Sequence, residues 1–256
     1  MRAIDGFRLD GQVAVVTGGG GGLGAAGALA LAEAGADIAL VARNRAKLEA
    51  AAQAVEATGR RALIVEADVA DEASITGAAE AVKAALGRID ILFNNAGITN
   101  PQTVLDIDPA DFRRLQDVNV TGAFLTIRAF VPGMIAAGYG RIVNMGSILS
   151  ARGMANRAAY CASKAGLANL GQACAFEFGP HGVTVNTLAA TVIVTDLNRD
   201  LVRTQPELYE AITRRTPLGR LGETDDLMGA LLFLSSPASG FVTGQTLFVD
   251  GGYTAG

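Results

Sequence analysis

Short apolar runs alternate with longer, helix-like segments from one end of the chain to the other. The runs are rich in β-branched residues and end at glycine or polar residues, a pattern typical of parallel strands buried on both faces. We predict strands at Val13–Gly18, Ala36–Ala42, 62–69, 89–97, 140–147, 183–188 and 245–252. The alanine- and leucine-rich segments between them predict helices at Leu23–Ala34, Arg45–Ala57, Ser74–Leu86, Pro109–Val131, Ala158–Phe178 and Thr224–Leu234. This alternation predicts one α/β domain over residues 1–256, a doubly wound seven-stranded parallel sheet with helices on both faces.

One connection interrupts the alternation. Residues Ala189–Arg215 lie between the sixth predicted strand and the last predicted helix, and they show little periodicity. Long irregular connections in compact domains often close over active sites. We therefore expect a substrate lid at about residues 189–215.

Composition and charge narrow the possible classes of protein. Of the 256 residues, 50% are hydrophobic and 18% charged, which excludes disorder and fits one domain with a large core. The net charge of −4 argues against nucleic acid or an anionic membrane as partner, and no apolar run reaches the roughly 18 residues of a membrane span. Cys161 and Cys174 lie 13 positions apart in one predicted helix, unsuited to a disulfide, so we expect a cytoplasmic protein. His181 is the single histidine, and no metal site is expected.

A run of five glycines, in "TGGGGGLG", directly follows the first predicted strand and opens the first predicted helix. Gly18, Gly22 and Gly24 have the spacing G-x3-G-x-G. Glycines at these places permit a tight turn and let the backbone approach a pyrophosphate, which the helix N-terminus attracts. The turn therefore predicts a dinucleotide site in a Rossmann fold, with a purely structural turn as the alternative. A P-loop is excluded because no Gly-Lys-Ser/Thr follows.

The end of the second predicted strand bears on the choice of dinucleotide. An NAD-binding chain usually carries an acidic residue there, whereas this chain has Arg43. An arginine can pair with a 2′-phosphate, so NADP is favoured and NAD is the second possibility, although a solvated loop arginine would look the same. Asp68, after the third strand, is expected either to bind the adenine amino group or to cap a helix.

The segment "YCASK" holds the candidate chemistry. Tyr160 and Lys164 lie four positions apart and so share one face of a predicted helix. A nearby ammonium lowers the pKa of a tyrosine and makes it a usable general acid/base. A surface Tyr/Lys pair is the alternative reading.

These motifs together resemble the short-chain dehydrogenase/reductase family, and the resemblance runs from Leu9 to Tyr253. It covers "TGGGGGLG", "NNAG", "VNVTG", "NMGS" and "YCASK". The resemblance implies hydride transfer between nicotinamide and a carbonyl or alcohol carbon, with Tyr160 as general acid/base. It implies that Ser147 aligns the substrate oxygen, that Lys164 holds the nicotinamide ribose, and that Asn119 binds a water on a proton path.

The resemblance also implies further contacts. The additional cofactor-binding residues it points to are Leu23, Asn95, Gly97 and Thr195. It implies a homotetramer, with Pro109–Val131 and Ala158–Phe178 at one interface and the C-terminal strand region at another.

The chain departs from the family pattern after its sixth predicted strand. Where the family usually has Pro-Gly, "NTLAATVIVT" has Ala190 and Thr191. A threonine forced to positive φ would be strained by about 1–2 kcal/mol. We therefore expect a reshaped lid.

The substrate is expected to be a small-molecule ketone or alcohol. The expected substrate contacts are Ser147, Leu149, Met154 and Val192, and the lid residues that line the pocket are expected to run from Val192 to Leu201. Several of these residues are apolar, which suits a bulky ketone. Arg152, Asn156 and Arg157 could instead meet a carboxylate or sugar hydroxyls. The C-terminal portion resembles gluconate 5-dehydrogenases and, slightly less, 3-oxoacyl-carrier-protein reductases. A nucleotide-binding regulator without catalysis is the alternative from another class.

Overall fold

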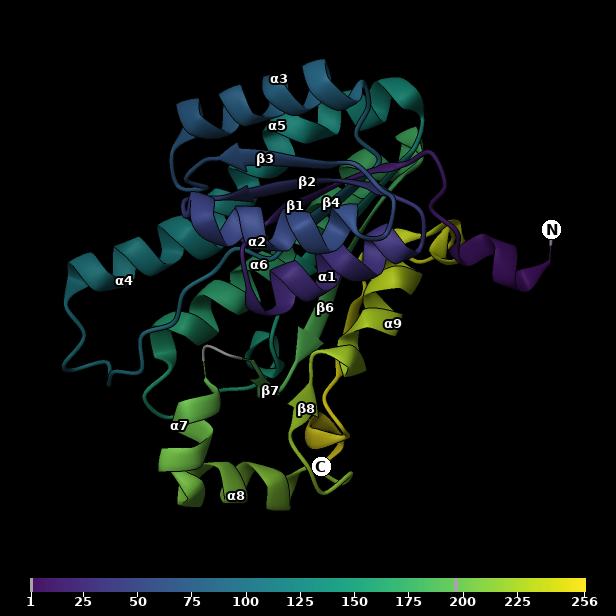
Figure 1. Ribbon diagram of the computed structural model, residues 1–256. Helices are drawn as coiled ribbons and strands as arrows, with labels where there is room; N and C mark the ends of the chain where they lie inside the picture. The colour runs from purple at the N-terminus through teal and green to yellow at the C-terminus, as the bar shows by residue number, and fades with distance from the viewer. Residues whose placement is uncertain (1, 196–197) are drawn as a thin grey trace.

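The computed structural model describes residues 2–195 and 198–256, except the side chains of Leu201 and Leu208, and it confirms the predicted fold (Figure 1). The strands of the main sheet in this part of the chain are β1 (Val13–Thr17), β2 (Asp37–Ala42), β3 (Ala62–Glu66), β4 (Ile91–Asn94), β5 (Gly140–Met145), β6 (Val183–Ala190) and β9 (Thr246–Val249). They are parallel, in the order β3-β2-β1-β4-β5-β6-β9. The chain leaves β1 toward β2 on one side and later returns to β4 on the other, so a crevice opens beyond the carboxyl ends of β1 and β4.

Each central strand buries both of its faces. In β1, Val13 and Val15 pack into one apolar core, and Ala14 and Val16 into the other. This two-sided burial explains why the strand is uniformly apolar in sequence. The helices that cover one face are α1 (Gly22–Glu33), α2 (Arg45–Glu56) and α9 (Asp225–Ser235), and those that cover the other are α3 (Glu72–Leu86), α5 (Gly122–Ala137) and α6 (Ala158–Phe178).

The helix predicted at Pro109–Val131 is divided into parts and runs further than predicted. α4 (Pro109–Gln116) leads into a π-helical turn at Asp117–Thr121, and α5 then continues to Ala137. The whole stretch is long and apolar enough to cross a membrane by length and composition. Its α5 part packs on the sheet instead, with Phe130 and other residues in the core beneath α3 and α6. It is therefore a core helix of this domain.

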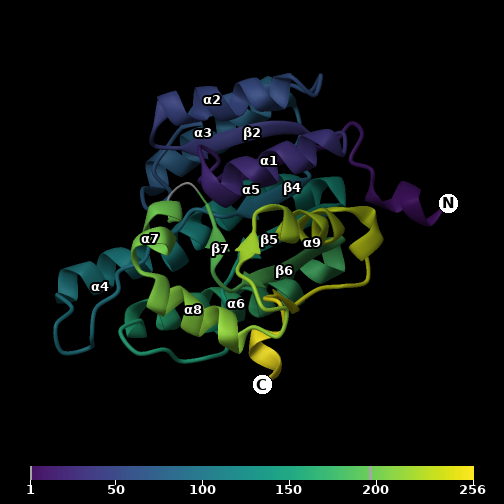
Figure 2. The same cartoon turned by 60° about the horizontal axis from the view of Figure 1, so that its bottom comes forward.

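The connection predicted to be irregular, at about residues 189–215, is largely regular, so that part of the prediction is wrong. β6 extends to Ala190, and two helices, α7 (Arg199–Thr204) and α8 (Pro206–Arg215), follow. Figures 1 and 2 show both helices beyond the carboxyl end of β6. Asp196, Leu197 and the side chain of Leu201 lie outside the described residues.

A two-stranded stem joins the two ends of this excursion. β7 (Ile193–Val194) pairs in parallel with β8 (Gly222–Glu223), just before α9. Each element alone is too short to be stable, so the stem depends on the sheet and helices around it.

Thr191 does not have the positive φ that would strain it. Across residues 2–195 and 198–256, Asn156 is the one non-glycine residue with positive φ, at 60°. Ala190, unlike a proline, keeps an N–H group and extends β6 to a pairing with Val249. The chain therefore passes the usual Pro-Gly position without positive φ, with Ala190 in β6 and Thr191 in the bend that follows it.

Candidate active site

The glycine turn lies at the crevice between β1 and β4. Gly18 has φ 65°, which favours glycine, and a Cβ on Gly24 would lie 2.2 Å from the carbonyl oxygen of Gly18. α1 begins at Gly22 with no side-chain cap at its N-terminus, so the amides of its first turn are open to an anion. The turn thus has the geometry of a phosphate cradle.

Two asparagines hold this region together. Asn95 Nδ2 donates to the carbonyl oxygens of Thr17, at 3.1 Å, and Gly18, at 3.4 Å, which ties the glycine turn to the loop after β4. Asn94 is buried, and its Nδ2 donates to Asn144 Oδ1 at 3.0 Å, which links β4 to β5. Both side chains therefore fix the backbone that surrounds the crevice.

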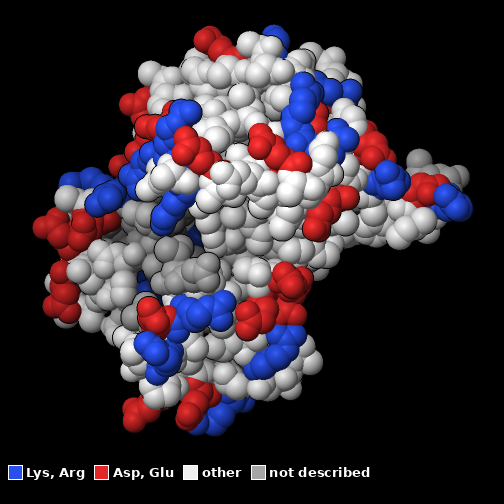
Figure 3. Space-filling view, in the orientation of Figure 1, with Lys and Arg blue, Asp and Glu red and all other residues white. Residues whose placement is uncertain are grey.

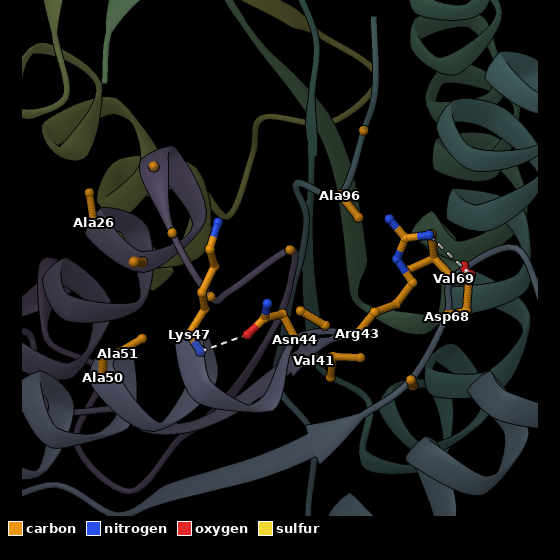
Figure 4. A pocket seen from close by; sticks show the side chains of 18 of the residues that line it. Ala26, Val41, Arg43, Asn44, Lys47, Ala50, Ala51, Asp68, Val69 and Ala96 are labelled. Atoms are coloured by element: carbon orange, nitrogen blue, oxygen red, sulfur yellow. Dashed lines mark hydrogen bonds and ion pairs between the residues drawn. The ribbon is translucent and has the colours of Figure 1, made fainter. Parts of the chain in front are cut away.

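A cavity of about 1190 Å³ extends from the glycine turn past the carboxyl ends of β2 and β3. Arg43 and Lys47 both line it, and Figure 4 shows their side chains entering from different sides, with Asn44 between them. Asn44 Oδ1 caps α2 by accepting from the backbone amide of Lys47 at 3.0 Å. Figure 3 shows Lys and Arg side chains bordering the hollow on this face. The cavity therefore offers two cations and a helix N-terminus to an anion.

Lys47 was missed by the sequence analysis, although its signal was present. Asn44 is a favoured helix N-cap, so α2 begins directly after it. The first turn of α2 then places Lys47 on the wall of the same cavity as Arg43. Arg43 Nη1 also lies 3.6 Å from Asp68 Oδ2, in an ion pair that is largely exposed. Such a pair contributes little to stability, so Arg43 can leave Asp68 and bind a more highly charged anion instead.

A second cavity, of about 360 Å³, adjoins the first. The residues that line both are Gly18, Gly21, Gly22, Ala96, Gly97 and Ile98. The smaller cavity is also lined by Ser147, Tyr160 and Lys164. Three predicted catalytic residues are thus brought together beside the phosphate cradle.

Each of these three side chains is positioned by its own element. Ser147 follows β5, and its Oγ accepts from the backbone amide of Leu149 at 3.2 Å. Tyr160 and Lys164 lie one turn apart on α6, and the Tyr160 hydroxyl lies close enough to Ser147 for that side chain to lower its pKa. Lys164 Nζ donates to the carbonyl oxygen of Met145 at 2.6 Å and lies 5.6 Å from the centroid of the Tyr160 ring.

Burial dominates the electrostatics of this pair. It raises the pKa of Tyr160 above its usual value of 10.0, and the Ser147 side chain and the charge of Arg157 lower it in part. Burial also lowers the pKa of Lys164 from 10.5 to about 8. The expectation that Lys164 depresses the pKa of Tyr160 is not met, since desolvation outweighs the nearby charges.

Asn119 lies in the π-helical turn and is buried. Its Oδ1 accepts from the backbone amide of Ile98 at 2.8 Å, and its Nδ2 donates to the Ile98 carbonyl and to Ser163 Oγ, both at 3.0 Å. A Cβ on Gly97 would lie 3.3 Å from Asn119 Oδ1 and 3.6 Å from Lys164 Nζ. Asn119 therefore holds the loop after β4 against Lys164, with its side-chain amide already committed.

The other predicted cofactor contacts lie on the same wall. Leu23 and Thr195 line the smaller cavity, together with Asn198, which was not singled out from the sequence. Asn198 Oδ1 accepts from the backbone amide of Thr195 at 2.8 Å, and its Nδ2 donates to the Ile193 carbonyl at 2.8 Å. Asn198 therefore fixes the orientation of Thr195.

Three predicted substrate contacts lie outside the residues that line the two cavities. Leu149 is buried in a small cluster with Ile148 and Tyr253, against which Tyr160 packs. Met154 is exposed at 37%. The Val192 carbonyl accepts from the backbone amide of Gly222 in the β7–β8 stem.

Comparison with known proteins agrees with this geometry. A family model described as enoyl-(acyl carrier protein) reductase matches residues 18–254. Galactitol 2-dehydrogenase (L-tagatose-forming) of Cereibacter sphaeroides is 42% identical over 252 residues, covering 97% of each chain. Gluconate 5-dehydrogenase of Gluconobacter oxydans is 38% identical, covering 98% of this chain and 97% of the relative. The crystal structure of a gluconate 5-dehydrogenase from Burkholderia cenocepacia, in complex with NADP and tartrate, is 40% identical, with a TM-score of 0.95 and full coverage of both chains. The chain belongs to the short-chain dehydrogenase/reductase family of oxidoreductases.

Proposed function

We propose that this protein transfers a hydride between NADP(H) and the carbonyl or alcohol carbon of a sugar acid, a polyol or a related ketone. The observation that carries the proposal is the meeting of Ser147, Tyr160 and Lys164 in one cavity that adjoins the glycine turn. By their names, the relatives act on galactitol and gluconate, and the Burkholderia neighbour was crystallised with NADP and tartrate.

The residues of the two cavities fit NADP. The open amides at the start of α1 would hold the pyrophosphate, and Gly24 leaves the room that a Cβ would fill. Arg43 and Lys47 would hold the 2′-phosphate, and Thr195 would face the nicotinamide end. NAD lacks the 2′-phosphate, so we expect it to bind the same turn more weakly.

The bound cofactor supplies the hydride in reduction and accepts it in oxidation. In reduction, the Tyr160 hydroxyl donates its proton to the carbonyl oxygen, which Ser147 orients by a hydrogen bond. The raised pKa of Tyr160 keeps this hydroxyl protonated at neutral pH, the form that reduction needs. In oxidation, Tyr160 first releases its proton to solvent, and the phenolate then accepts the proton of the substrate hydroxyl. Lys164 holds the ribose, and Asn119 keeps the neighbouring loop in place.

A cofactor and ketone panel tests this function. We expect NADPH to be consumed, seen as loss of its near-ultraviolet absorbance, with 5-ketogluconate faster than with a β-ketoester or a bulky aryl ketone. A preference for the β-ketoester would favour the 3-oxoacyl-carrier-protein reductase alternative. If the protein bound the cofactor but reduced no ketone, the non-catalytic regulator would be the remaining alternative and the proposal would be overturned.

Arg43 and Lys47 should decide the cofactor preference. We expect Arg43→Ala and Lys47→Ala each to weaken NADPH binding about five- to tenfold, because each removes one charged contact from a partly exposed anion site. NADH binding should change by less than about twofold. Titration of cofactor fluorescence measures both. Arg45→Ala is the matched control, since Arg45 pairs with Glu49 and does not line the cavity. If the affinities for both cofactors fell equally, the two side chains would support the folded structure and would not recognise the 2′-phosphate.

We also propose that the protein is a cytoplasmic homotetramer. Phe124 on α5 and Phe176 on α6 are exposed at 46% and 88%, and Phe241 before β9 is fully exposed. These apolar side chains lie on the two surfaces that the family resemblance points to. Both cysteines are free, which suits a reducing compartment.

A further inference from the structure

Arg157 lies next to a residue of the cavity that holds Ser147 and Tyr160. It precedes α6, three positions before Tyr160, and its side chain is half-buried. Its Nη1 donates to Thr99 Oγ1 at 3.2 Å, and Thr99 lines the smaller cavity with Ser147 and Tyr160. The guanidinium is therefore one hydrogen bond away from the wall of the site.

The backbone before Arg157 is unusual. Asn156 adopts the left-handed conformation noted above, with φ 60°, and α6 starts two residues later, at Ala158. Asparagine adopts this region more readily than most residues, and such conformations persist where the surrounding structure requires them, often at functional sites. This turn joins the loop after Ser147 to the helix that carries Tyr160.

The charge of Arg157 has no acidic partner. In residues 2–195 and 198–256, no carboxylate lies within ion-pair distance of its guanidinium, and Asp111 accepts from Asn100 Nδ2 at 3.2 Å. Its charge lies close enough to the Tyr160 hydroxyl to lower the pKa of that group. Arg152, from the same loop, is exposed and donates instead to the carbonyl oxygen of Thr254 at 2.8 Å.

We infer that Arg157 binds the carboxylate of the substrate, so that the protein acts on hydroxy acids and their keto acids in preference to neutral polyols. The inference rests on the proposed function and names its substrate class. The carboxylate takes up the guanidinium donors that Thr99 leaves free, while the alcohol carbon faces Ser147 and Tyr160. Oxidation then moves a hydride to NADP⁺ and the hydroxyl proton to Tyr160, and yields the keto acid, NADPH and, on release from Tyr160, one proton.

A pair of substrates that differ in one group provides the test. D-Gluconate and D-glucitol differ in a carboxylate against a hydroxymethyl group, and kcat/KM with NADP⁺ is measured for each. We expect the native protein to prefer gluconate. Arg157→Gln should lower kcat/KM for gluconate about 10- to 100-fold, the value of a hydrogen bond to a charged group, and that for glucitol by less than about threefold. Arg157→Lys should restore part of the gluconate rate, and Arg152→Gln should leave the ratio of the two unchanged.

Two outcomes would overturn the inference while leaving the proposed function in place: a native preference for glucitol, or an equal loss of both rates in Arg157→Gln. A separate binding measurement tests the inference even if the protein shows no catalytic activity. Tartrate and gluconate are titrated into the protein–NADPH complex, followed by cofactor fluorescence. Binding that Arg157→Gln weakens supports the inference even if no turnover is found, and binding that it leaves unchanged contradicts it.

Discussion

Replacing Tyr160 with phenylalanine should lower kcat for ketone reduction about a thousandfold, while the affinity for NADPH changes little. General acid catalysis contributes about 10²- to 10⁴-fold, and this substitution removes the proton donor and nothing else. The ring should stay in place, because it packs against the cluster of Ile148, Leu149 and Tyr253. Single-turnover kinetics with saturating NADPH measures the chemical step directly.

Tyr139→Phe is the matched control for this variant. Tyr139 is also a largely desolvated tyrosine, its hydroxyl donates to Gln12 Oε1 at 3.4 Å, and it lies outside both cavities. We expect it to keep at least half of the native kcat. If Tyr160→Phe retained more than about a tenth of the native rate, the general acid would have to be another group.

Lys164→Met should remove activity and, near pH 7, stabilise the folded protein by about 2 kcal/mol. A lysine whose pKa is lowered from 10.5 to about 8 by burial carries an unfavourable free energy of about 3 kcal/mol while it is charged. The lost hydrogen bond to the Met145 carbonyl offsets part of the gain, by about 1 kcal/mol. A catalytic lysine held at such a cost to stability is expected where function requires it.

The gain should depend on pH in a defined direction. Between the folded pKa of about 8 and the ordinary value of 10.5, the unfolded chain binds more protons at this site than the folded protein, so native stability rises with pH across that range. The advantage of Lys164→Met is therefore full below pH 8 and shrinks toward about pH 10.5. Urea unfolding at about pH 7 and about pH 10, at one protein concentration, measures it.

Lys83→Met provides the control, because Lys83 is exposed on α3. We expect it to change the free energy of unfolding by less than about 0.5 kcal/mol at either pH. A loss of stability in Lys164→Met at about pH 7 would show that the native ammonium is favourably bound, contrary to the burial argument.

The sheet could be predicted because its strands bury both faces. The third strand was nonetheless predicted too long: Ala67 and Val69 are buried, but they lie beyond the last residue of β3 that pairs with β2. The pattern of apolar residues shows which positions are buried, but it does not show where the hydrogen bonding between two strands ends. The same limit hid the π-helical turn, since one extra residue in a helical turn leaves little trace in the apolar pattern of its neighbours.

The meeting of Tyr160 and Lys164 in one cavity could be predicted because their spacing is local and puts them on one helix face. Contacts between distant segments could not. Thr99 and Arg157 come from different loops, and only the folded chain shows that they meet. The helices within residues 189–215 were missed for another reason. Pro206, at the first turn of α8, was an available helix-start signal, but this helix is short and carries few apolar residues.

The β7–β8 stem has a consequence for how this protein can change over generations. Pairing of Ile193 with Gly222 and of Val194 with Glu223 pins both ends of the α7–α8 excursion. With its ends held together, the excursion can gain, lose or replace residues at a small entropic cost, while the strands and helices that hold Ser147 and Tyr160 stay unchanged. Relatives can therefore exchange the segment between Val194 and Gly222 as one unit, while the elements that hold Ser147 and Tyr160 are inherited separately from it.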